Sequence, residues 1–319
     1  MKQIVLSAFV TAGLAGAALA QEPVWDGNTV VLESRKLAEG VFAVIPAGAG
    51  EMAVAGYPIA TSGGFVIGEN GVLVIESMLN ERLTAQFFDL IAAQTDKPVR
   101  YLVNTSYHGD HSYGNQYLPE GVDIIQHANT AAYIGTNIEA DKAFMIRNFG
   151  EGRGIEEIVA TDADILVGTG GSLTVNLGDV TVDIRDFGFA QTGGDLFVSV
   201  PQANVLWTGN AIVAQAPALP WLLDGNLVET RNTLQSVYDA FNADTTVVPG
   251  HGPVTDIAAI RWAVDYLTAV EAGVTAAISD GLSLEDTVAR VQLPEYQGYA
   301  LFGWVHPGLN VPAAYRDLQ

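Results

Sequence analysis

The chain contains the stretch Asn104-Thr105-Ser106-Tyr107-His108-Gly109-Asp110-His111, which places two histidines and an aspartate within four residues. An apolar run that is typical of a buried strand, residues 101–103, comes directly before it. Imidazole nitrogen and carboxylate oxygen are good ligands for Zn²⁺ and related divalent ions. Because α/β scaffolds commonly present their sites at strand ends, the stretch predicts a metal site at the edge of a sheet.

A second histidine motif lies late in the chain. His251 is flanked by glycines in Pro249-Gly250-His251-Gly252, just after the strand-like run 246–248. A glycine-flanked histidine at a strand end is free to point into a cleft. Taken together with the earlier cluster, the position favours a ligand over a structural histidine. The remaining histidines, His127 and His306, are more typical of cap or packing residues.

Runs typical of strands and helices alternate in both halves of the chain. The first half predicts strands at 41–45, 64–68, 71–75, 99–103 and 122–125 and helices at 79–95 and 129–147. The second half predicts strands at 173–177, 180–184, 196–200, 204–208 and 246–248 and helices at 228–241, 257–278 and 284–291. Two β-then-α halves favour an α/β protein with two sheets back to back and helices outside.

Composition excludes several classes of partner and chemistry. The formal net charge is -22, from 14 basic and 36 acidic residues, so a nucleic-acid partner is not expected. The chain has no cysteine, which excludes disulfides, thiolate ligands and a cysteine nucleophile. A metal would therefore be held by histidine, carboxylate or neutral donors. With 319 residues, 49% of them hydrophobic, the chain can build a large core.

The first residues resemble a secretory signal. Lys2 precedes an apolar run at 4–19, and Ala18-Leu19-Ala20 fits a small-x-small cleavage site. We expect a signal peptide at 1–20, a single domain at 21–319 with a helical and aromatic C-terminal tail from about 257, and a periplasmic or secreted location. No membrane insertion is expected after cleavage, because no later segment has the length of a transmembrane helix.

Four motifs occur in a characteristic order. They are Ser106-Tyr107-His108-Gly109-Asp110-His111, Gly188-Phe189-Ala190-Gln191-Thr192-Gly193-Gly194-Asp195, Thr208-Gly209-Asn210 and Gly250-His251-Gly252. Over residues 30–270 the chain thereby resembles the metallo-β-lactamase-fold hydrolase superfamily. The resemblance implies an αββα sandwich of two mixed β-sheets with helices on the outer faces and the site at one edge of the sheets.

The resemblance also implies six metal-contacting positions, which are His108, Asp110, His111, Gln191, Asn210 and His251. The family's second site uses an aspartate and two histidines, and these are all kept. Its first site uses three histidines, of which two are replaced by Ser106 and Gln191, and the bridging carboxylate becomes Asn210. Glu76-Ser77 also stands where the family often has Asp-Thr-Gly.

These replacements predict one metal ion instead of two. Two divalent ions ~3.5–4 Å apart repel one another and need anionic bridging. We therefore expect a single ion at Asp110, His111 and His251, with Zn²⁺ as the default and Fe²⁺ fitting the same ligands.

The expected function is hydrolysis of a small ester, lactone or amide by a water molecule bound to that ion. A bound Zn²⁺ ion can lower the pKa of such a water from ~15.7 to ~7, which makes it a nucleophile at neutral pH. Asp110, His108 and Ser106 are the candidate catalytic residues, with His108 as a general base or water-orienting group and Ser106 as a hydrogen-bond partner of the water. A catalytically inactive binding or accessory protein of the same fold is the main alternative, and other metal chemistry, such as redox, is a third. The expected partner is a small-molecule substrate, and the oligomeric state is not predicted.

Overall fold

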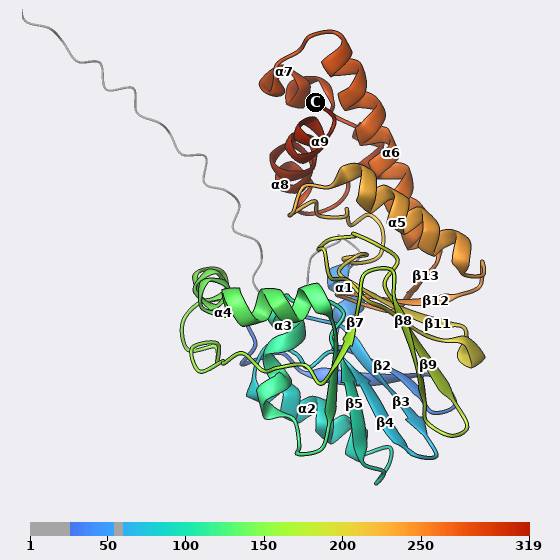
Figure 1. Ribbon diagram of the computed structural model, residues 1–319. Coiled ribbons are helices and arrows are strands. Elements are labelled where there is room, and N and C mark those ends of the chain that lie inside the picture. Colours follow the sequence, from blue (N-terminus) through green and yellow to red (C-terminus); the bar gives the residue numbers. More distant parts are fainter. Residues whose placement is uncertain (1–25, 54–59) are drawn as a thin grey trace, which may run out of the picture.

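The computed structural model describes residues 26–53 and 60–319 of the chain (Figure 1). The predicted signal peptide at 1–20 therefore lies outside the described residues. Two β-sheets lie against one another, with helices on their outer faces. This confirms the expected αββα sandwich of two mixed sheets.

The first sheet has seven strands in sequence order. They are β1 (Leu32–Ala38), β2 (Val41–Pro46), β3 (Gly63–Gly68), β4 (Gly71–Ile75), β5 (Val99–Val103), β6 (Asp123–His127) and β7 (Ile165–Val167). The first four strands pair antiparallel, and β4 to β7 pair parallel. The parallel strands β4, β5 and β6 thus bring their carboxyl ends to one edge.

The second sheet has six strands in the order β13-β12-β11-β10-β9-β8. They are β8 (Ser172–Asn176), β9 (Thr181–Arg185), β10 (Phe197–Val200), β11 (Val205–Gly209), β12 (Thr246–Pro249) and β13 (Thr255–Asp256). Only β11 and β12 pair parallel, and the other neighbours are antiparallel. The carboxyl ends of β11 and β12 therefore lie side by side.

Alternation along the strands builds a core on each face of the first sheet. In β2, Val41 and Ala43 belong to the core between the sheets, whereas Phe42 and Val44 belong to the core beneath the outer helices. Since both faces are covered, β2 is buried throughout its length, and it reads in the sequence as a continuous apolar run. Trp207 of β11 ties the two sheets together, because its Nε1–H donates to the Gly63 carbonyl at 3.0 Å.

Helices cover the two outer faces. On the first sheet lie α2 (Glu81–Ala92) and α4 (Ala128–Phe149), and on the second lie α5 (Leu227–Ala240) and α6 (Ala258–Ser279). The short helices α1 (Ala49–Ala53) and α3 (Gly109–Ser112) belong to loops at the sheet edge. None of the described helices is long and apolar enough to span a membrane.

The chain ends in a group of short helices that packs beside α6 (Figure 1). These are α7 (Leu284–Arg290), α8 (Phe302–Trp304), a π-helical turn at Val305–Asn310 and α9 (Val311–Asp317). Within this tail the Asn310 amide donates to the Pro220 carbonyl at 2.8 Å and accepts the Leu222 N–H at 3.0 Å. The tail therefore holds the loop that follows β11.

The predicted elements are found with small shifts at their ends. The helix predicted at 79–95 is α2, which starts after Asn80 because the Asn80 side chain caps it by accepting the Leu83 N–H. The sequence has a β-rich run at residues 30–32, and the strand found there, β1, lies further along at 32–38. The strands β7 and β13 were not predicted, since runs of three and two residues carry no clear periodicity. That residues 21–319 form a single domain stays a prediction.

Candidate metal centre

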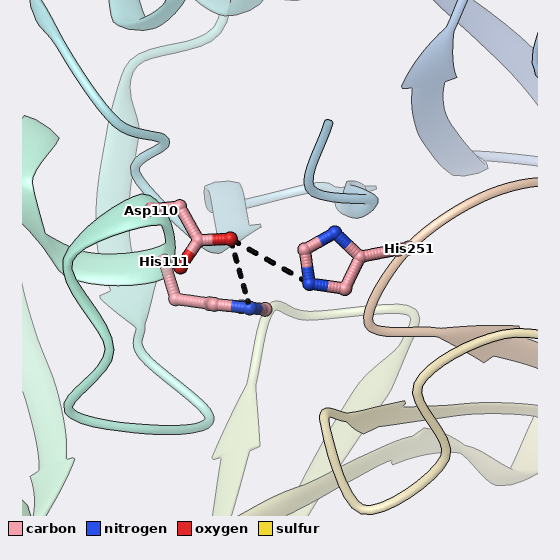
Figure 2. Close-up of side chains that lie close together, drawn as sticks. All are labelled: Asp110, His111 and His251. Carbon is pink, nitrogen blue, oxygen red and sulfur yellow. Dashed lines mark ion pairs between the residues drawn. The ribbon is translucent and has the colours of Figure 1, made fainter. Parts of the chain in front are cut away.

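Three side chains converge at the edge where β5 and β12 end (Figure 2). Asp110 and His111 lie on α3, a few residues after β5, and His251 follows β12. We call these three residues the cation set. Asp110 Oδ2 lies 3.7 Å from His111 Nε2 and 3.5 Å from His251 Nε2, and one ligand atom of each residue lies within 4.8 Å of the others. All three side chains are buried.

Glu76 fixes the orientation of His111. The His111 Nδ1–H donates to Glu76 Oε1 at 3.0 Å, and the same carboxylate accepts hydrogen bonds from the backbone and hydroxyl of Thr105. Glu76 is buried at the end of β4 and has a left-handed backbone with φ 70°, a strained conformation for a non-glycine residue. Nε2 of His111 is thereby left to face Asp110 and His251, without a hydrogen-bond partner among the described residues.

The electrostatics of the cation set favour a positive charge there. Burial acts to lower the pKa of His111, but the carboxylates of Asp110 and Glu76 outweigh it and raise that pKa to about 9. Burial likewise acts to raise the pKa of Asp110, yet the imidazoles of His111 and His251 hold it below its ordinary value. Asp110 is therefore an ionised carboxylate at neutral pH, as a metal ligand must be.

A short segment before β3 links the early and late parts of the site. The Thr61 hydroxyl donates to Asp110 Oδ2 at 2.8 Å, and Thr61 pairs with His251 through an isolated β-bridge. Next to it, Ser62 donates from its backbone to the Gly250 carbonyl at 2.8 Å and from its hydroxyl to the Gly252 carbonyl at 2.7 Å. These contacts hold His251 in register with Asp110.

The cation set fits a divalent ion. His111 Nε2 and Asn210 Oδ1 are both buried polar atoms without a hydrogen-bond partner in the described part of the chain. Buried polar atoms of this kind are costly unless a further group satisfies them, and a metal ion would satisfy both once His111 has lost its proton. Two imidazole nitrogens and one carboxylate form a donor set that suits Zn²⁺ or Fe²⁺ and leaves positions open for other ligands.

A second group of candidate residues carries no charge of its own. We call Ser106, Gln191 and Asn210 the neutral set. Ser106 is buried, and its hydroxyl oxygen accepts the backbone N–H of His108 at 3.3 Å. Asn210 directly follows β11 and places its amide nitrogen 3.0 Å from His108 Nδ1. Gly250 leaves the space for this amide, since a Cβ there would lie 2.2 Å from Asn210 Oδ1.

His108 lies outside the cation set, and its predicted contact with a metal stays a prediction. Among the described residues the group of potential ligands contains only Asp110, His111 and His251. The His108 ring instead contacts the amide of Asn210. Burial and the two neighbouring imidazoles lower the pKa of His108 to about 4, although Asp110 opposes them, so this ring is neutral at pH 7.

Gln191 is held in a rigid loop between β9 and β10. Its backbone N–H donates to Asp195 Oδ2 at 2.6 Å, and the same carboxylate accepts from the backbone and hydroxyl of Thr192. Burial raises the pKa of Asp195 to about 6. Leu196 then donates to the Thr105 carbonyl at 2.9 Å, which joins this loop to the turn that carries Ser106.

The other two histidines have structural roles, as the sequence predicted. His127 caps α4, because its Nδ1 accepts the Asn129 N–H at 3.0 Å. His306 is buried in the tail, where it accepts from the Tyr266 hydroxyl and donates to the Val291 carbonyl, both at 2.8 Å.

Sequence reasoning assigned no role to Glu76 and did not single out Thr61, although both support the cation set. Glu76 did carry a signal, since it is an acidic residue directly after the wholly apolar run of β4. Thr61 carried none, because its role depends on a pairing with His251 across 190 positions of the chain.

No family model matches the sequence. Similar solved structures include a metallo-β-lactamase from Pontibacter korlensis, with 19% identity and TM-score 0.55 over 74% of this chain and 99% of that one. The metallo-β-lactamase FIM-1 from Pseudomonas aeruginosa, in a mono-zinc form, gives 16% identity and TM-score 0.55 over 75% of this chain and 96% of that one.

The stereoselective inverting sec-alkylsulfatase Pisa1 from Pseudomonas sp. gives 16% identity and TM-score 0.65 over 91% of this chain. This chain matches half of the sulfatase, 50% of its length. These likenesses agree with the two sheets and their outer helices. The chain therefore has the fold of the metallo-β-lactamase superfamily.

Proposed function

We propose that this protein is a metal-dependent hydrolase that uses one divalent ion, Zn²⁺ or Fe²⁺, held by Asp110, His111 and His251. The observation that carries the proposal is the buried convergence of these side chains, with His111 Nε2 left unpartnered while Glu76 holds Nδ1. A histidine fixed by a carboxylate in this way has its free nitrogen oriented for a metal.

The neutral set supports a single ion. Ser106, Gln191 and Asn210 offer a hydroxyl and two amides, which are weak ligands and contribute no negative charge. A second cation beside the first would have no bridging carboxylate to offset the repulsion between the two charges. Among the described residues, only the cation set brings a carboxylate together with two imidazole rings.

A bound ion would supply Lewis acidity and a water whose pKa is lowered to ~7. The chain's own groups then orient the reactants. No hydrogen bond reaches Oδ1 of Asp110 from the described residues, so this oxygen is available to accept a hydrogen bond from the attacking water. The Ser106 hydroxyl accepts the His108 N–H, and its own hydrogen is free to donate. In the net reaction the water oxygen bonds to the acyl carbon, the bond to the leaving group breaks, and the leaving group takes up a proton.

The substrate class is a small ester, lactone or amide. The similar proteins are β-lactamases and an alkylsulfatase, so a β-lactam and a secondary alkyl sulfate belong in the test panel. The net charge of -22 disfavours nucleic acid as a substrate. We also propose export to the periplasm or medium, on the pattern of residues 1–20, and the N-terminal residue of the secreted protein would test it.

The alternative is a protein that keeps the fold for binding and has lost catalysis. The three replacements of the neutral set favour it, since each removes a group that the family uses for metal binding. Metal content separates the two functions, because an inactive binding protein has no need for a buried ion.

The experiment is elemental analysis of the purified protein, followed by turnover of lactones, esters, amides, β-lactams and an alkyl sulfate. We expect about one ion per chain in the wild type and almost none in Asp110→Asn and His251→Ala. Asp96→Asn makes the same chemical change at an exposed position and should keep the metal. A metal-free wild-type protein would contradict the proposal, as would turnover that is unchanged in Asp110→Asn.

A further inference from the structure

Asn210 lies between the cation set and His108. Its amide nitrogen is 3.0 Å from His108 Nδ1, so the NH₂ group faces His108. The amide oxygen lies on the other side of the group, where it is buried and has no hydrogen-bond partner among the described residues.

The neighbouring cation set determines which way the Asn210 amide is oriented. Asn210 Oδ1 is buried and without a partner among the described residues, as is His111 Nε2. Rotating the amide by 180° would turn its N–H donors toward the cation set, which on the proposed function holds a cation, and this is electrostatically unfavourable. With the metal bound, only the orientation with the oxygen toward the cation set is compatible with both neighbours.

We propose that Asn210 holds His108 in the Nε2–H tautomer, so that His108 donates a hydrogen bond to the acceptor oxygen of a bound substrate. The hydrogen-bond geometry requires this tautomer: an N–H of Asn210 can only donate, so Nδ1 of His108 accepts and the ring hydrogen sits on Nε2. The identity of the acceptor, a carbonyl oxygen, rests on the proposed function. Asn210 is the positioning residue, and His108 is the group that touches the substrate.

His108 is free to serve this role. In the part of the chain that the structure describes, no protein acceptor lies within hydrogen-bond distance of its Nε2, and the residue is only partly buried. Its backbone N–H is fixed by Ser106, and its ring lies edge-on to Tyr107 with centroids 5.0 Å apart. The donor is thus held in place beside the cation set, with the His108 and His111 ring centroids 6.5 Å apart.

This role differs from the one predicted from sequence. A general base needs a lone pair on the nitrogen that faces the water, and here Nε2 carries hydrogen instead. A fixed donor stabilises the negative charge that develops on a carbonyl oxygen during hydrolysis, and loss of such a donor costs about 10²–10³-fold in rate.

The tautomer can be measured directly by NMR on the zinc-loaded protein with ¹⁵N-labelled histidine. The chain has five histidines, and the signal missing from His108→Gln assigns His108. We expect a hydrogen on Nε2 of His108 in the wild type and on Nδ1 in Asn210→Asp, where a carboxylate oxygen would replace the N–H. A hydrogen on Nδ1 in the wild type would overturn the proposal.

Kinetics test the donor with matched variants. Glutamine places an N–H near the position of Nε2, whereas asparagine carries the same amide but is too short to reach it. We expect His108→Gln to keep activity within about tenfold of the wild type, and His108→Asn and His108→Ala to lose about 10²–10³-fold. Equal losses in all three variants, each with its metal content intact, would overturn the donor role.

The two proposals fail in different ways. A wild type that binds no metal, or that hydrolyses nothing in the panel, contradicts the proposed function. The NMR spectrum shows the His108 tautomer whether or not the protein hydrolyses any substrate. The positioning role of Asn210 is therefore tested independently of the proposed function.

Discussion

The cation set and the neutral set lie side by side at one sheet edge, yet they are built differently. Each member of the cation set is held by a further group: Glu76 for His111, Thr61 for Asp110 and the backbone of residues 61–62 for His251. The neutral set hydrogen-bonds to His108 and to its own loops, and it contributes no charge. The comparison indicates that the identity of the ligand residues does not by itself make a metal site. The residues that hydrogen-bond to the ligands supply part of the negative charge and fix the orientation of the ligand side chains.

The largest expected effect is the conversion of the neutral set into a second site. The combined variant Ser106→His, Gln191→His and Asn210→Asp adds two imidazoles and one carboxylate. We expect metal content to rise from about one ion per chain to about two, since an anionic bridge then offsets the repulsion between the ions. Elemental analysis after gel filtration checks this. A metal content that stays near one ion per chain would show that the identity of the ligand residues does not by itself explain why the neutral set binds no second ion.

The next effect is the pH dependence of metal binding. The pKa of His111 is raised to about 9 in the metal-free protein, so a proton competes with the metal for this ring at every pH below that value. Affinity should therefore fall by about tenfold per unit as the pH drops from 9 to 7, which is about a hundredfold in total. Asp110, with its lowered pKa, stays ionised over this range. Zinc titrations at constant ionic strength measure the slope, and a flat profile would contradict the raised pKa.

Removing the carboxylate behind His111 should have a somewhat smaller effect. In Glu76→Gln the side-chain oxygen can still accept from Nδ1, but the negative charge is gone. We expect the dissociation constant for zinc at pH 9 to rise by about ten- to a hundredfold. Glu33→Gln, an exposed residue of β1, is the control for loss of one negative charge. Equal affinities in the two variants would show that Glu76 does not support the ligand.

The smallest effect is expected from Thr61→Val, which keeps the shape of the side chain and removes one hydrogen bond to Asp110. A bond of this kind contributes about 1 kcal/mol, which corresponds to about fivefold in zinc affinity. Competition against a chelator resolves such a change. A loss above about a hundredfold would mean that the β-bridge between residue 61 and His251 had been disturbed as well.

The sequence predicted the cation set because two of its members are adjacent and the third lies in a glycine-flanked turn after a strand. It predicted the layers because strand-like runs are followed by helical runs in both halves of the chain, and the continuous apolar runs of β2 and β4 fit a sheet that is covered on both faces.

Other features could not be read from the sequence because they depend on contacts between distant segments. The role of Thr61 requires the pairing of residue 61 with residue 251, and the orientation of the Asn210 amide depends on His108, which lies about a hundred positions earlier in the chain. Neither contact leaves a periodic or compositional signal.

The hydrogen bonds of Asn310 have a further consequence for the integrity of the protein. They fasten the last thirty or so residues to the loop at Pro220 and Leu222, which begins only a few positions after Asn210. Proteolytic trimming at the C-terminus would remove these hydrogen bonds together with the apolar residues that the tail adds to the core beside α5 and α6. The loop at Pro220 and Leu222 would then lose the contacts that hold it, so an intact C-terminus is part of what keeps the second sheet covered.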